Sequence, residues 1–495
     1  MKPNSSLKPF AALNSLSTGV KGLDEILRGG LTRDRLYLIE GMPGSGKTTL
    51  ALQFLLDGAR LGEVVLYITL SETEAELKAV AESHGWNLDG IHIHEVIATE
   101  DFLDPAQQHT IFHPSEVELG DTTRNISLIV DAIKPMRVVI DSLSELRLLS
   151  SNPHRYRRQI LAYKQFFSRR EITVVMLDDR PDAHDMQIRS IAHGVINLEQ
   201  CVSDYGLSRR RLRIVKYRGV EFREGYHDYK IRRGGMVAFP RLVAAQTRVL
   251  ENRGQISSGL AALDTQLGGG LEEGTSTIIG GPPGTGKSTL AAQFAYAAIE
   301  RGDKISMFIF EESINNLLNR TDVIGINLSG AIQAGLASIH QVDPAELSPG
   351  EFTDLVCHET DTGTKLIVID SLNGFLQAMP DERFLTLHLH ELLAYLGQKG
   401  IVTILVGVHE GIIGNDMRSA IEASYLADNV VLLRHFEFDG EVHQAISIFK
   451  KRTSNHERTI REFSISKNGI RVGEILQRFH GVLTGVPTYT GSVLG

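Results

Sequence analysis

Cysteine is almost missing from this sequence: Cys201 and Cys357 are the only two among 495 residues, and they lie in different halves of the chain. Two distant cysteines exclude a disulfide framework and a CxxC metal site, so the composition indicates a reducing compartment. Long apolar runs are also missing, because no stretch approaches the roughly 18 uninterrupted apolar residues of a membrane span. The polar start MKPNSSLKPFAALNSL has no apolar core of a secretion signal. We therefore expect a cytoplasmic protein that does not enter membranes.

An excess of positive charge is the third feature that the sequence lacks. The formal net charge is −9, so no overall basic field attracts nucleic acid or an anionic membrane surface. One basic run, Arg209–Arg213, has no interleaved aromatic residues, which favours a solvated or interface edge over a nucleic-acid surface. What the chain has is an ordinary globular composition, 42% hydrophobic and 22% charged, over a length sufficient for two or three domains.

The sequence contains the same glycine-rich motif twice. Both GMPGSGKT, ending at Thr48, and GPPGTGKS, ending at Ser288, match G-x-x-x-x-G-K-[ST], and their lysines are 240 residues apart (287 − 47). The surroundings repeat at the same offset, because Ser17–Asp24 is similar to Ser257–Asp264. One match would be a weak signal. Two matches at a domain-length period indicate a duplicated nucleotide-binding module.

Each copy alternates short apolar runs with helical stretches. The runs before the glycine motifs, Leu36–Ile39 and Ser276–Ile279, are typical of buried parallel strands. This order predicts an α/β fold in which each copy is a mainly parallel, doubly wound sheet. Alternating segments at 209–237 and 441–472 predict an antiparallel extension of each sheet. The predicted organisation is a tail at 1–16, domains at 17–245 and 246–480, and a second tail at 481–495.

The glycine motifs predict two phosphate cradles for ATP. Backbone N–H groups of such a loop converge on anionic oxygens, and glycine permits the close backbone approach that this needs. Lys47 and Lys287 would contact the β- and γ-phosphates, and the hydroxyls of Thr48 and Ser288 would bind Mg²⁺. The alternative, a turn that binds nothing, is much less favoured because each motif is complete. The predicted nucleotide-binding residues are Gly44, Ser45, Gly46, Lys47, Thr48, Thr49, Gly284, Thr285, Gly286, Lys287, Ser288 and Thr289.

Two aspartates end later apolar runs: Asp141 follows Arg137–Ile140, and Asp370 follows Leu366–Ile369. Ligands of open α/β sheets bind beyond the carboxyl ends of the strands, where a carboxylate can hold Mg²⁺ through water. The alternative role for an isolated aspartate here is to cap the next helix. The glycine motif in each copy favours the metal role for both residues.

Acidic residues after another strand are candidates for a catalytic base. Glu311 and Glu312 follow Met307–Phe310, and Ser71 and Glu72 stand at the same place in the first copy. Such a carboxylate can activate a nucleophile beside the γ-phosphate, although an acid in a first helical turn is also favoured by the helix dipole. We assign a catalytic role to all three glutamates, with Glu312 as the base of the second copy. The copy with Ser71 is expected to be the weaker catalyst.

A pair of cations stands late in each copy, Lys216 with Arg218 and Lys450 with Arg452. Both pairs follow apolar strands and lie too far along the chain to belong to the glycine loop of their own copy. In an oligomeric ATPase they could stabilise the charge that develops on a neighbour's γ-phosphate. A solvated strand edge is the alternative, and the residues alone favour neither role.

Together these motifs resemble the KaiC family, the double-domain branch of the RecA-like ATPases. The resemblance covers about 17–480 and rests on the paired openings, glycine loops, strand-ending aspartates and K-x-R pairs, on the E-E-S stretch, and on FHGVLTGVP at 479–487. It implies a homo-hexameric double ring with ATP between subunits in both tiers. It also implies slow ATP hydrolysis, autophosphorylation in the C-terminal tier, and K-x-R pairs that contact a neighbour's nucleotide.

The same resemblance places Ser424 and Tyr425 where the family has a Ser-Thr pair of phosphoacceptors. Ser424 keeps the hydroxyl nucleophile, whereas the phenol of Tyr425 departs from a two-site serine/threonine cycle. Ser71 replaces the first acid of the N-terminal tier. The segment Thr488–Gly495 is shorter than the tail through which the family meets its activator KaiA, so we expect no activator to dock there.

We therefore expect a KaiC-like ATPase that uses ATP and Mg²⁺, hydrolyses ATP slowly and autophosphorylates at Ser424, in signalling, clock-like or stress regulation. The alternative is an ATP-gated hexameric scaffold that recruits a KaiB-like protein or a histidine kinase without significant turnover. A DNA-binding ATPase in the manner of RecA comes third, because the net charge of −9 disfavours it.

Overall fold

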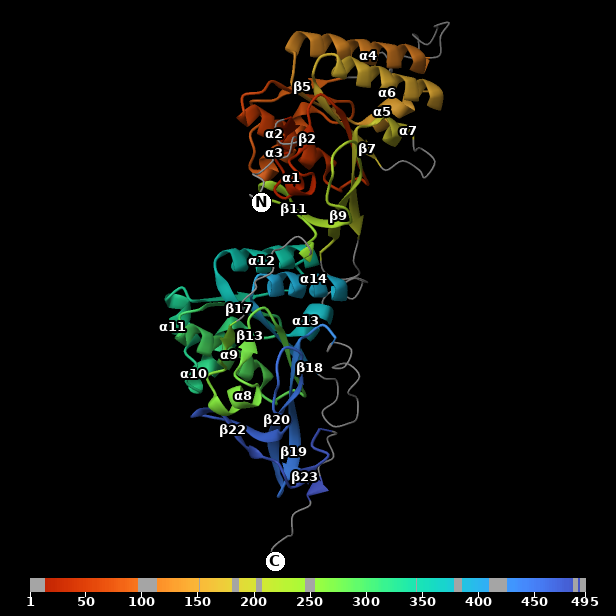
Figure 1. Cartoon of the computed structure of the whole chain (residues 1–495). Coiled ribbons are helices and arrows are strands. Elements are labelled where there is room, and N and C mark those ends of the chain that lie inside the picture. The colour runs from red at the N-terminus through yellow and green to blue at the C-terminus, as the bar shows by residue number, and fades with distance from the viewer. Residues whose placement is uncertain are drawn as a thin grey trace, which may run out of the picture. The chain divides into compact units, whose positions relative to one another are not determined.

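The computed structural model describes residues 14–96, 114–150, 152–179, 187–201, 207–244, 254–343, 345–377, 385–408, 425–483 and 488–489. The chain divides into two compact units, residues 1–241 and 242–495 (Figure 1). The predicted domain boundary, between 245 and 246, lies close to this division. Within the described ranges, no helix is both long and apolar enough to cross a membrane.

A nine-stranded sheet forms the centre of the N-terminal unit, in the order β11-β10-β9-β8-β3-β7-β6-β4-β5. The strands from β8 to β5 in this order pair in parallel, whereas β9, β10 and β11 are antiparallel. The glycine loop therefore emerges from β3, in the middle of the carboxyl edge. The strands are β3 (Leu36–Gly41), β4 (Val65–Thr69), β5 (His92–Glu95), β6 (Arg137–Asp141), β7 (Thr173–Asp179), β8 (Gly194–Cys201), β9 (Arg209–Tyr217), β10 (His227–Arg232) and β11 (Gly235–Phe239).

The C-terminal unit repeats this plan with the order β16-β15-β17-β18-β14-β19-β20-β21-β22. Here β14 precedes the glycine loop and lies between β18 and β19, again with an antiparallel extension. The prediction of two mainly parallel α/β sheets, each with an antiparallel extension, is confirmed. The strands are β14 (Ser276–Gly281), β15 (Lys304–Ile309), β16 (Ala337–Gln341), β17 (Thr364–Asp370), β18 (Val402–Val408), β19 (Asn429–Phe438), β20 (Glu441–Lys451), β21 (Ile460–Ser466) and β22 (Gly469–Ile475).

Helices cover both faces of each sheet. In the N-terminal unit they are α1 (Leu23–Ile26), α2 (Lys47–Arg60), α3 (Glu74–His84), α4 (Pro114–Ile133), α5 (Leu143–Leu148), α6 (Pro153–Ser168) and α7 (Gln187–Ile191). In the C-terminal unit they are α8 (Ala261–Gln266), α9 (Lys287–Glu300), α10 (Ile314–Val323), α11 (Leu328–Gln333), α12 (Pro349–Asp361), α13 (Leu372–Gln377) and α14 (Leu385–Gln398). Short strand pairs complete the fold: β1 (Ser15–Leu16) with β2 (Leu31–Thr32), β12 (Gln255–Ile256) with β13 (Leu271–Glu272), and β23 (Phe479–His480) with β24 (Thr488–Tyr489).

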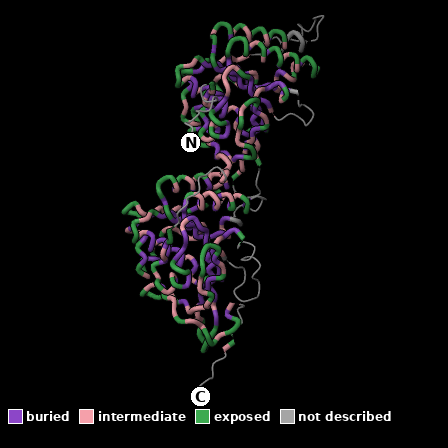
Figure 2. The backbone as a smooth tube through the Cα atoms, in the orientation of Figure 1, coloured by how far each residue is buried: buried purple, intermediate pink, exposed green. Residues whose placement is uncertain are grey.

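Each unit has a hydrophobic core on both sides of its sheet. In β3, Tyr37 and Ile39 pack with α2, whereas Leu36 and Leu38 pack on the opposite face with α6. This two-sided burial explains why the parallel strands are apolar at consecutive positions. Figure 2 shows the buried residues gathered inside each unit, with exposed residues along the outer helices.

The antiparallel extension of each sheet contains a β-bulge at the same place. In β9, Leu212 and Ile214 face the core, and the next core residue is Tyr217 rather than Lys216. The register shifts opposite Val195, and Val215, which is 38% exposed, is the extra residue. An extra residue reverses the two-residue alternation of a strand. Lys216 is therefore kept off the core face.

The bulge of the C-terminal unit has the same effect on β20. Ile446 and Ile448 face the core, and the extra residue is Phe449, which is 49% exposed. Lys451 takes the inward position that follows, where its Nζ donates to the carbonyl oxygen of Gly270 at 2.9 Å. Lys450 is thereby kept off the core face, as Lys216 is.

Candidate nucleotide site

The two glycine loops have the same backbone conformation. Gly44 and Gly46 have φ values of 80° and 91°, and Gly284 and Gly286 have 80° and 90°. The positive φ favours glycine at Gly46, and a Cβ there would also meet Cδ1 of Ile231 at 2.4 Å. Helices α2 and α9 begin directly after these loops, and the free N–H groups of their first turns face the predicted phosphate position.

The predicted phosphate-binding lysines are both held by their own loops. Nζ of Lys47 donates to the carbonyl oxygens of Gly41 and Met42 at 2.8 and 3.2 Å, and Nζ of Lys287 donates to that of Pro282 at 2.8 Å. Burial lowers the pKa of Lys287, and nearby carboxylates oppose the shift. Each lysine is thus buried beside the loop whose phosphates it is predicted to bind.

Lys47 has one partner that the sequence did not suggest. Oδ1 of Asp179 lies 2.9 Å from its Nζ, and Oδ2 of Asp179 accepts a hydrogen bond from Ser144 at 3.0 Å. Asp179 is the last residue of β7. The strand register matches Asp179 to Val408 in the C-terminal unit, because they pair with Gly41 and Gly281 respectively. Only the N-terminal unit therefore has a carboxylate at this position.

The predicted metal ligands meet within each unit. Oγ1 of Thr48 donates to Oδ2 of Asp141 at 3.3 Å, and the Tyr67 hydroxyl donates to the same oxygen at 2.6 Å. In the C-terminal unit Ser288 hydrogen-bonds Asp370. Burial raises the pKa of both aspartates, and the hydroxyl bonds oppose the shift. Tyr67 is a site residue that the sequence analysis missed.

This donor set fits Mg²⁺. Magnesium in nucleotide sites is held by one or two protein oxygens together with phosphate oxygens and water. Each unit offers one hydroxyl and one carboxylate, and the described part of the chain contains no group of three or more His, Cys, Asp or Glu side chains that would hold a metal alone. The site is therefore suited to a metal that arrives with a nucleotide.

The candidate bases have different surroundings in the two units. Glu72 has a buried Oε2 without a hydrogen-bond partner, and its pKa is raised by burial and by Asp141, while Lys47 opposes the shift. Oε1 of Glu311 accepts a hydrogen bond from the Ser371 hydroxyl at 2.6 Å. The Glu311 charge also acts on Lys287 and on Asp370.

Glu312 is held by an arginine that the sequence analysis did not single out. Nε and Nη2 of Arg320 lie 3.2 and 2.8 Å from the two Glu312 oxygens, and Nη1 donates to Oγ1 of Thr289 at 2.8 Å. At the offset of 240, the residue matched to Arg320 is Val80. The ion pair is therefore confined to the C-terminal unit.

The K-x-R pairs lie at the amino edge of the sheets. Lys216 pairs with Val195 near the start of β8, whereas the loop follows Gly41 at the opposite end of β3. About four residues, or roughly 13 Å, separate the two edges. Nζ of Lys216 donates to the carbonyl oxygens of Arg189 and Ala192 at 2.6 and 2.7 Å.

The C-terminal pair is placed in the same way. Lys450 donates to the carbonyl oxygen of Ala427 at 2.8 Å, and Nη1 of Arg452 lies 3.6 Å from Oδ1 of Asp428. Arg452 also donates to the carbonyl oxygen of Tyr425, whose side chain is 56% exposed. Ser424 lies outside the described residues.

Comparison with known proteins gives one consistent result. The family model for the KaiC ATPase matches residues 16–243 and again 256–477. The chain is 26% identical to the circadian clock oscillator protein KaiC of Thermostichus vulcanus over 491 residues, which cover 97% of this chain and 92% of the relative. It is 27% identical to the KaiC of Acaryochloris marina, with 96% and 92% covered, and 26% identical to the circadian clock protein KaiC3 of Synechocystis sp., with 97% and 95% covered.

Proposed function

The chain belongs to the KaiC family of ATPases, and from this premise we propose that it binds Mg-ATP at both glycine loops and hydrolyses it slowly. The observation that carries this proposal is the repeated meeting of a buried lysine, a hydroxyl and a buried aspartate at the start of α2 and of α9. The reaction would be an in-line attack of water on the γ-phosphate. A bound Mg²⁺ would supply positive charge for the phosphate oxygens.

Each residue of a loop has a separate role in this scheme. The first-turn N–H groups bind phosphate oxygens, and Lys47 or Lys287 leaves its carbonyl partners to pair with the β- and γ-phosphates. Thr48 and Asp141 would hold the Mg²⁺ that accompanies the nucleotide, and the Tyr67 hydroxyl fixes the orientation of the Asp141 carboxylate. Lys47 must also leave Asp179.

Two glutamates compete for the role of base in the C-terminal unit. Glu312 is the base that the sequence indicated, but the Arg320 ion pair engages both of its oxygens. Glu311 has one oxygen bound by Ser371 and lies within electrostatic range of Lys287 and Asp370. The geometry favours Glu311 as the group that accepts a proton, with Glu312 and Arg320 as a positioning pair.

We further propose a homo-hexamer in which the K-x-R pairs act on a neighbour's nucleotide. The strand registers support this proposal. Each K-x-R pair lies at the amino edge of its sheet, whereas the glycine loop of the same unit lies at the carboxyl edge. A cation at that edge can meet a γ-phosphate only in another copy. Autophosphorylation at Ser424, with Tyr425 beside it, is the corresponding proposal for the C-terminal tier.

Nucleotide stoichiometry tests the proposal. Equilibrium dialysis with labelled ATP and Mg²⁺ should show two loop-bound nucleotides per chain. Lys47→Ala or Lys287→Ala should remove one of them, and both substitutions together should remove both. Lys78→Ala, in the exposed ion pair with Glu74, is the control and should retain two. Two nucleotides retained in the double variant would overturn the assignment of the loops.

A scaffold that assembles on ATP without turnover is the second candidate, and Ser71 in place of an acid favours it for the N-terminal tier. Its partner would be a KaiB-like protein or a histidine kinase. The response would be clock-like, as the relatives' names indicate for those proteins, or a stress response. Light scattering with and without ATP, run beside a phosphate-release assay, separates the candidates. Assembly without release supports the scaffold, whereas release in the assembled state supports the ATPase.

A further inference from the structure

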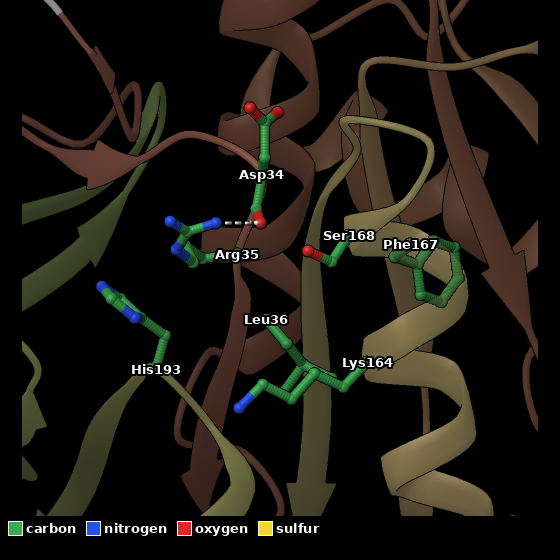
Figure 3. Close-up of a pocket in the computed structure, with 7 residues that line it drawn as sticks. All are labelled: Asp34, Arg35, Leu36, Lys164, Phe167, Ser168 and His193. Atoms are coloured by element: carbon green, nitrogen blue, oxygen red, sulfur yellow. Dashed lines mark hydrogen bonds between the residues drawn. The ribbon is translucent and has the colours of Figure 1, made fainter.

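A small pocket lies at the amino edge of the N-terminal sheet, on the opposite side from the glycine loop. Its volume is about 160 Å³, and its lining residues are Asp34, Arg35, Leu36, Lys164, Phe167, Ser168 and His193 (Figure 3). They come from the start of β3, the last turns of α6 and the residue before β8. None of the roles assigned to the nucleotide sites uses them.

The pocket gathers two cations, Arg35 and Lys164, and Asp34 is the carboxylate in its lining. Arg35 donates to the backbone carbonyl of Asp34 at 3.0 Å, and Lys164 donates to that of Ile191 at 2.9 Å. In Figure 3 the Asp34 carboxylate points away from the Arg35 guanidinium. Among the residues that the structure describes, no ion pair with an acid is formed by Arg35 or Lys164.

Two more cations stand beside this pocket. Nη2 of Arg218 donates to the carbonyl oxygen of Ser190 at 2.6 Å, near the carbonyl partners of Lys216. The pKa of Lys164 is lowered by burial and then by Arg218 and Arg35. The positive groups are thus close enough to repel one another, which is costly unless an anion joins them.

His193 adds a buried nitrogen atom that the protein does not satisfy. Its Nε2 is shielded from solvent and has no hydrogen-bond partner in the structure. Burial and then the four surrounding cations lower the pKa of His193 to about 4. The ring is therefore neutral at neutral pH and can donate one hydrogen bond. Buried polar atoms without a partner are uncommon and mark places where a ligand or water belongs.

The C-terminal unit has a pocket at the matching place, and its chemistry differs. The strand registers and turn contacts match Arg35 to Thr275, Lys164 to Leu393 and His193 to Asp428. That pocket is lined by Leu393 and Asp428 among others, with a volume of about 270 Å³. Arg35 and Lys164 are therefore specific to the N-terminal unit, whereas Arg452, the counterpart of Arg218, also lines the C-terminal pocket.

We propose that Arg35, Lys164, His193 and Ser168 form a second oxyanion site, which takes a phosphate group. A guanidinium offers paired donors to phosphate oxygens, an ammonium adds a point charge, and the imidazole and hydroxyl can add neutral donors. The group could be free orthophosphate or the terminal phosphate of a nucleotide, since the chemistry is the same. The site requires neither glycine loop and does not depend on the proposed ATPase.

Phosphate binding to the full chain tests this site, with both loops disabled by Lys47→Ala and Lys287→Ala. Equilibrium dialysis with labelled orthophosphate should give one ion per chain. Arg35→Gln with Lys164→Gln should weaken binding at least tenfold. The matched control removes two cations from the C-terminal unit, Arg301→Gln with Lys399→Gln, and should leave the affinity unchanged. Equal weakening in both double variants, or no weakening in the first, would overturn the proposal.

A second arm identifies the source of the phosphate group. ATP replaces orthophosphate in the same loop-disabled chain, and competition between the two probes decides which one binds more tightly. Tighter orthophosphate binding assigns the site to the free ion, and tighter ATP binding assigns it to a nucleotide.

A third measurement needs no substitution. Mass spectrometry after brief acetylation should show several-fold protection of Lys164 by orthophosphate, relative to chloride at equal ionic strength. Lys399, which is in the other unit, should react at the same rate in both salts. Equal acetylation of Lys164 in both salts would contradict the site even if the variants failed to fold.

Discussion

The two units have the same strand order and the same glycine loops, but they differ in the charges that surround those loops. In the N-terminal unit a carboxylate, Asp179, pairs with Lys47, and among the described residues no arginine pairs with Glu72. In the C-terminal unit Val408 replaces Asp179, and Arg320 binds Glu312. The comparison shows that the duplicated fold keeps the phosphate cradle constant. The acids and bases around the cradle differ between the two copies.

We expect the largest effect from substitutions that test whether phosphoryl transfer in each unit needs the K-x-R cations of a neighbouring copy. Arg452→Met should lower phosphoryl transfer in the C-terminal unit about a thousandfold, because such cations stabilise the transition-state charge. Arg218→Met should have the corresponding effect on the N-terminal unit. Single-turnover assays with labelled ATP measure both. Arg458→Met, an exposed change in the same unit as Arg452, is the control, and unchanged rates in Arg452→Met would exclude a role in trans.

The next effect separates the two acids of the C-terminal unit. Glu311→Gln should reduce phosphoryl transfer about a hundredfold, since general-base catalysis typically contributes that much or more. Glu312→Gln should reduce it less than tenfold, because this residue is held by Arg320. Phosphate incorporation and release, measured for each variant, decide the matter. A larger loss in Glu312→Gln would restore Glu312 as the base.

A smaller effect concerns the lysine that is paired with a carboxylate in one unit only. Asp179→Asn should tighten ATP binding at the N-terminal loop about two- to fivefold, because Asp179 competes with phosphate for Lys47 and is partly exposed. Val408→Asp should weaken binding at the C-terminal loop. Dialysis in a Lys287→Ala or Lys47→Ala background isolates each loop. Asp131→Asn, in an exposed ion pair with Arg170, should change neither affinity.

The smallest effect is a pH dependence of stability in the N-terminal unit. Burial raises the pKa of Asp178 to about 6, although Arg147 opposes the shift. A raised pKa means that the folded state binds more protons than the unfolded state, so this group favours folding increasingly as pH falls from 7 towards 4. Asp178→Asn should remove that contribution, at most about 1.4 kcal/mol per pH unit.

Thermal unfolding at pH 5 and pH 7 measures this contribution. Asp131→Asn serves as a control of opposite sign, since the Arg170 hydrogen bond lowers the pKa of Asp131. An unchanged difference between the two pH values in Asp178→Asn would show that this carboxyl is not responsible.

The sequence predicted the features that depend on local pattern. The glycine loops, the two sheets and the positions of Asp141 and Asp370 follow from motifs and from runs of apolar residues. It did not predict the pairing of Asp179 with Lys47 or of Arg320 with Glu312. Those partners are brought together by strand order and helix packing, which spacing along the chain does not encode. Two acidic residues after a strand are as typical of a strand end exposed to solvent as they are of a catalytic site.

The sequence also did not predict the pocket that contains Arg35, Lys164 and His193. Its residues come from three separate elements, and each is unremarkable in its own segment. A comparison of the two units identifies these side chains once the structure is known. The same fold has Thr275, Leu393 and Asp428 at the matched positions, so it does not require Arg35, Lys164 and His193.

Because of the bulges at Val215 and Phe449, the exact number of residues in β9 and β20 decides where the cations that follow are placed. Loss of either residue would restore strict alternation and turn Lys216 or Lys450 into the hydrophobic core, with Tyr217 or Lys451 turned outward. A deletion of one residue here would reverse which of the following side chains face the core and which face outward, although the composition of the strand would hardly change. Evolution can therefore lengthen the surface loops of this protein more freely than it can change these two strands by a single residue.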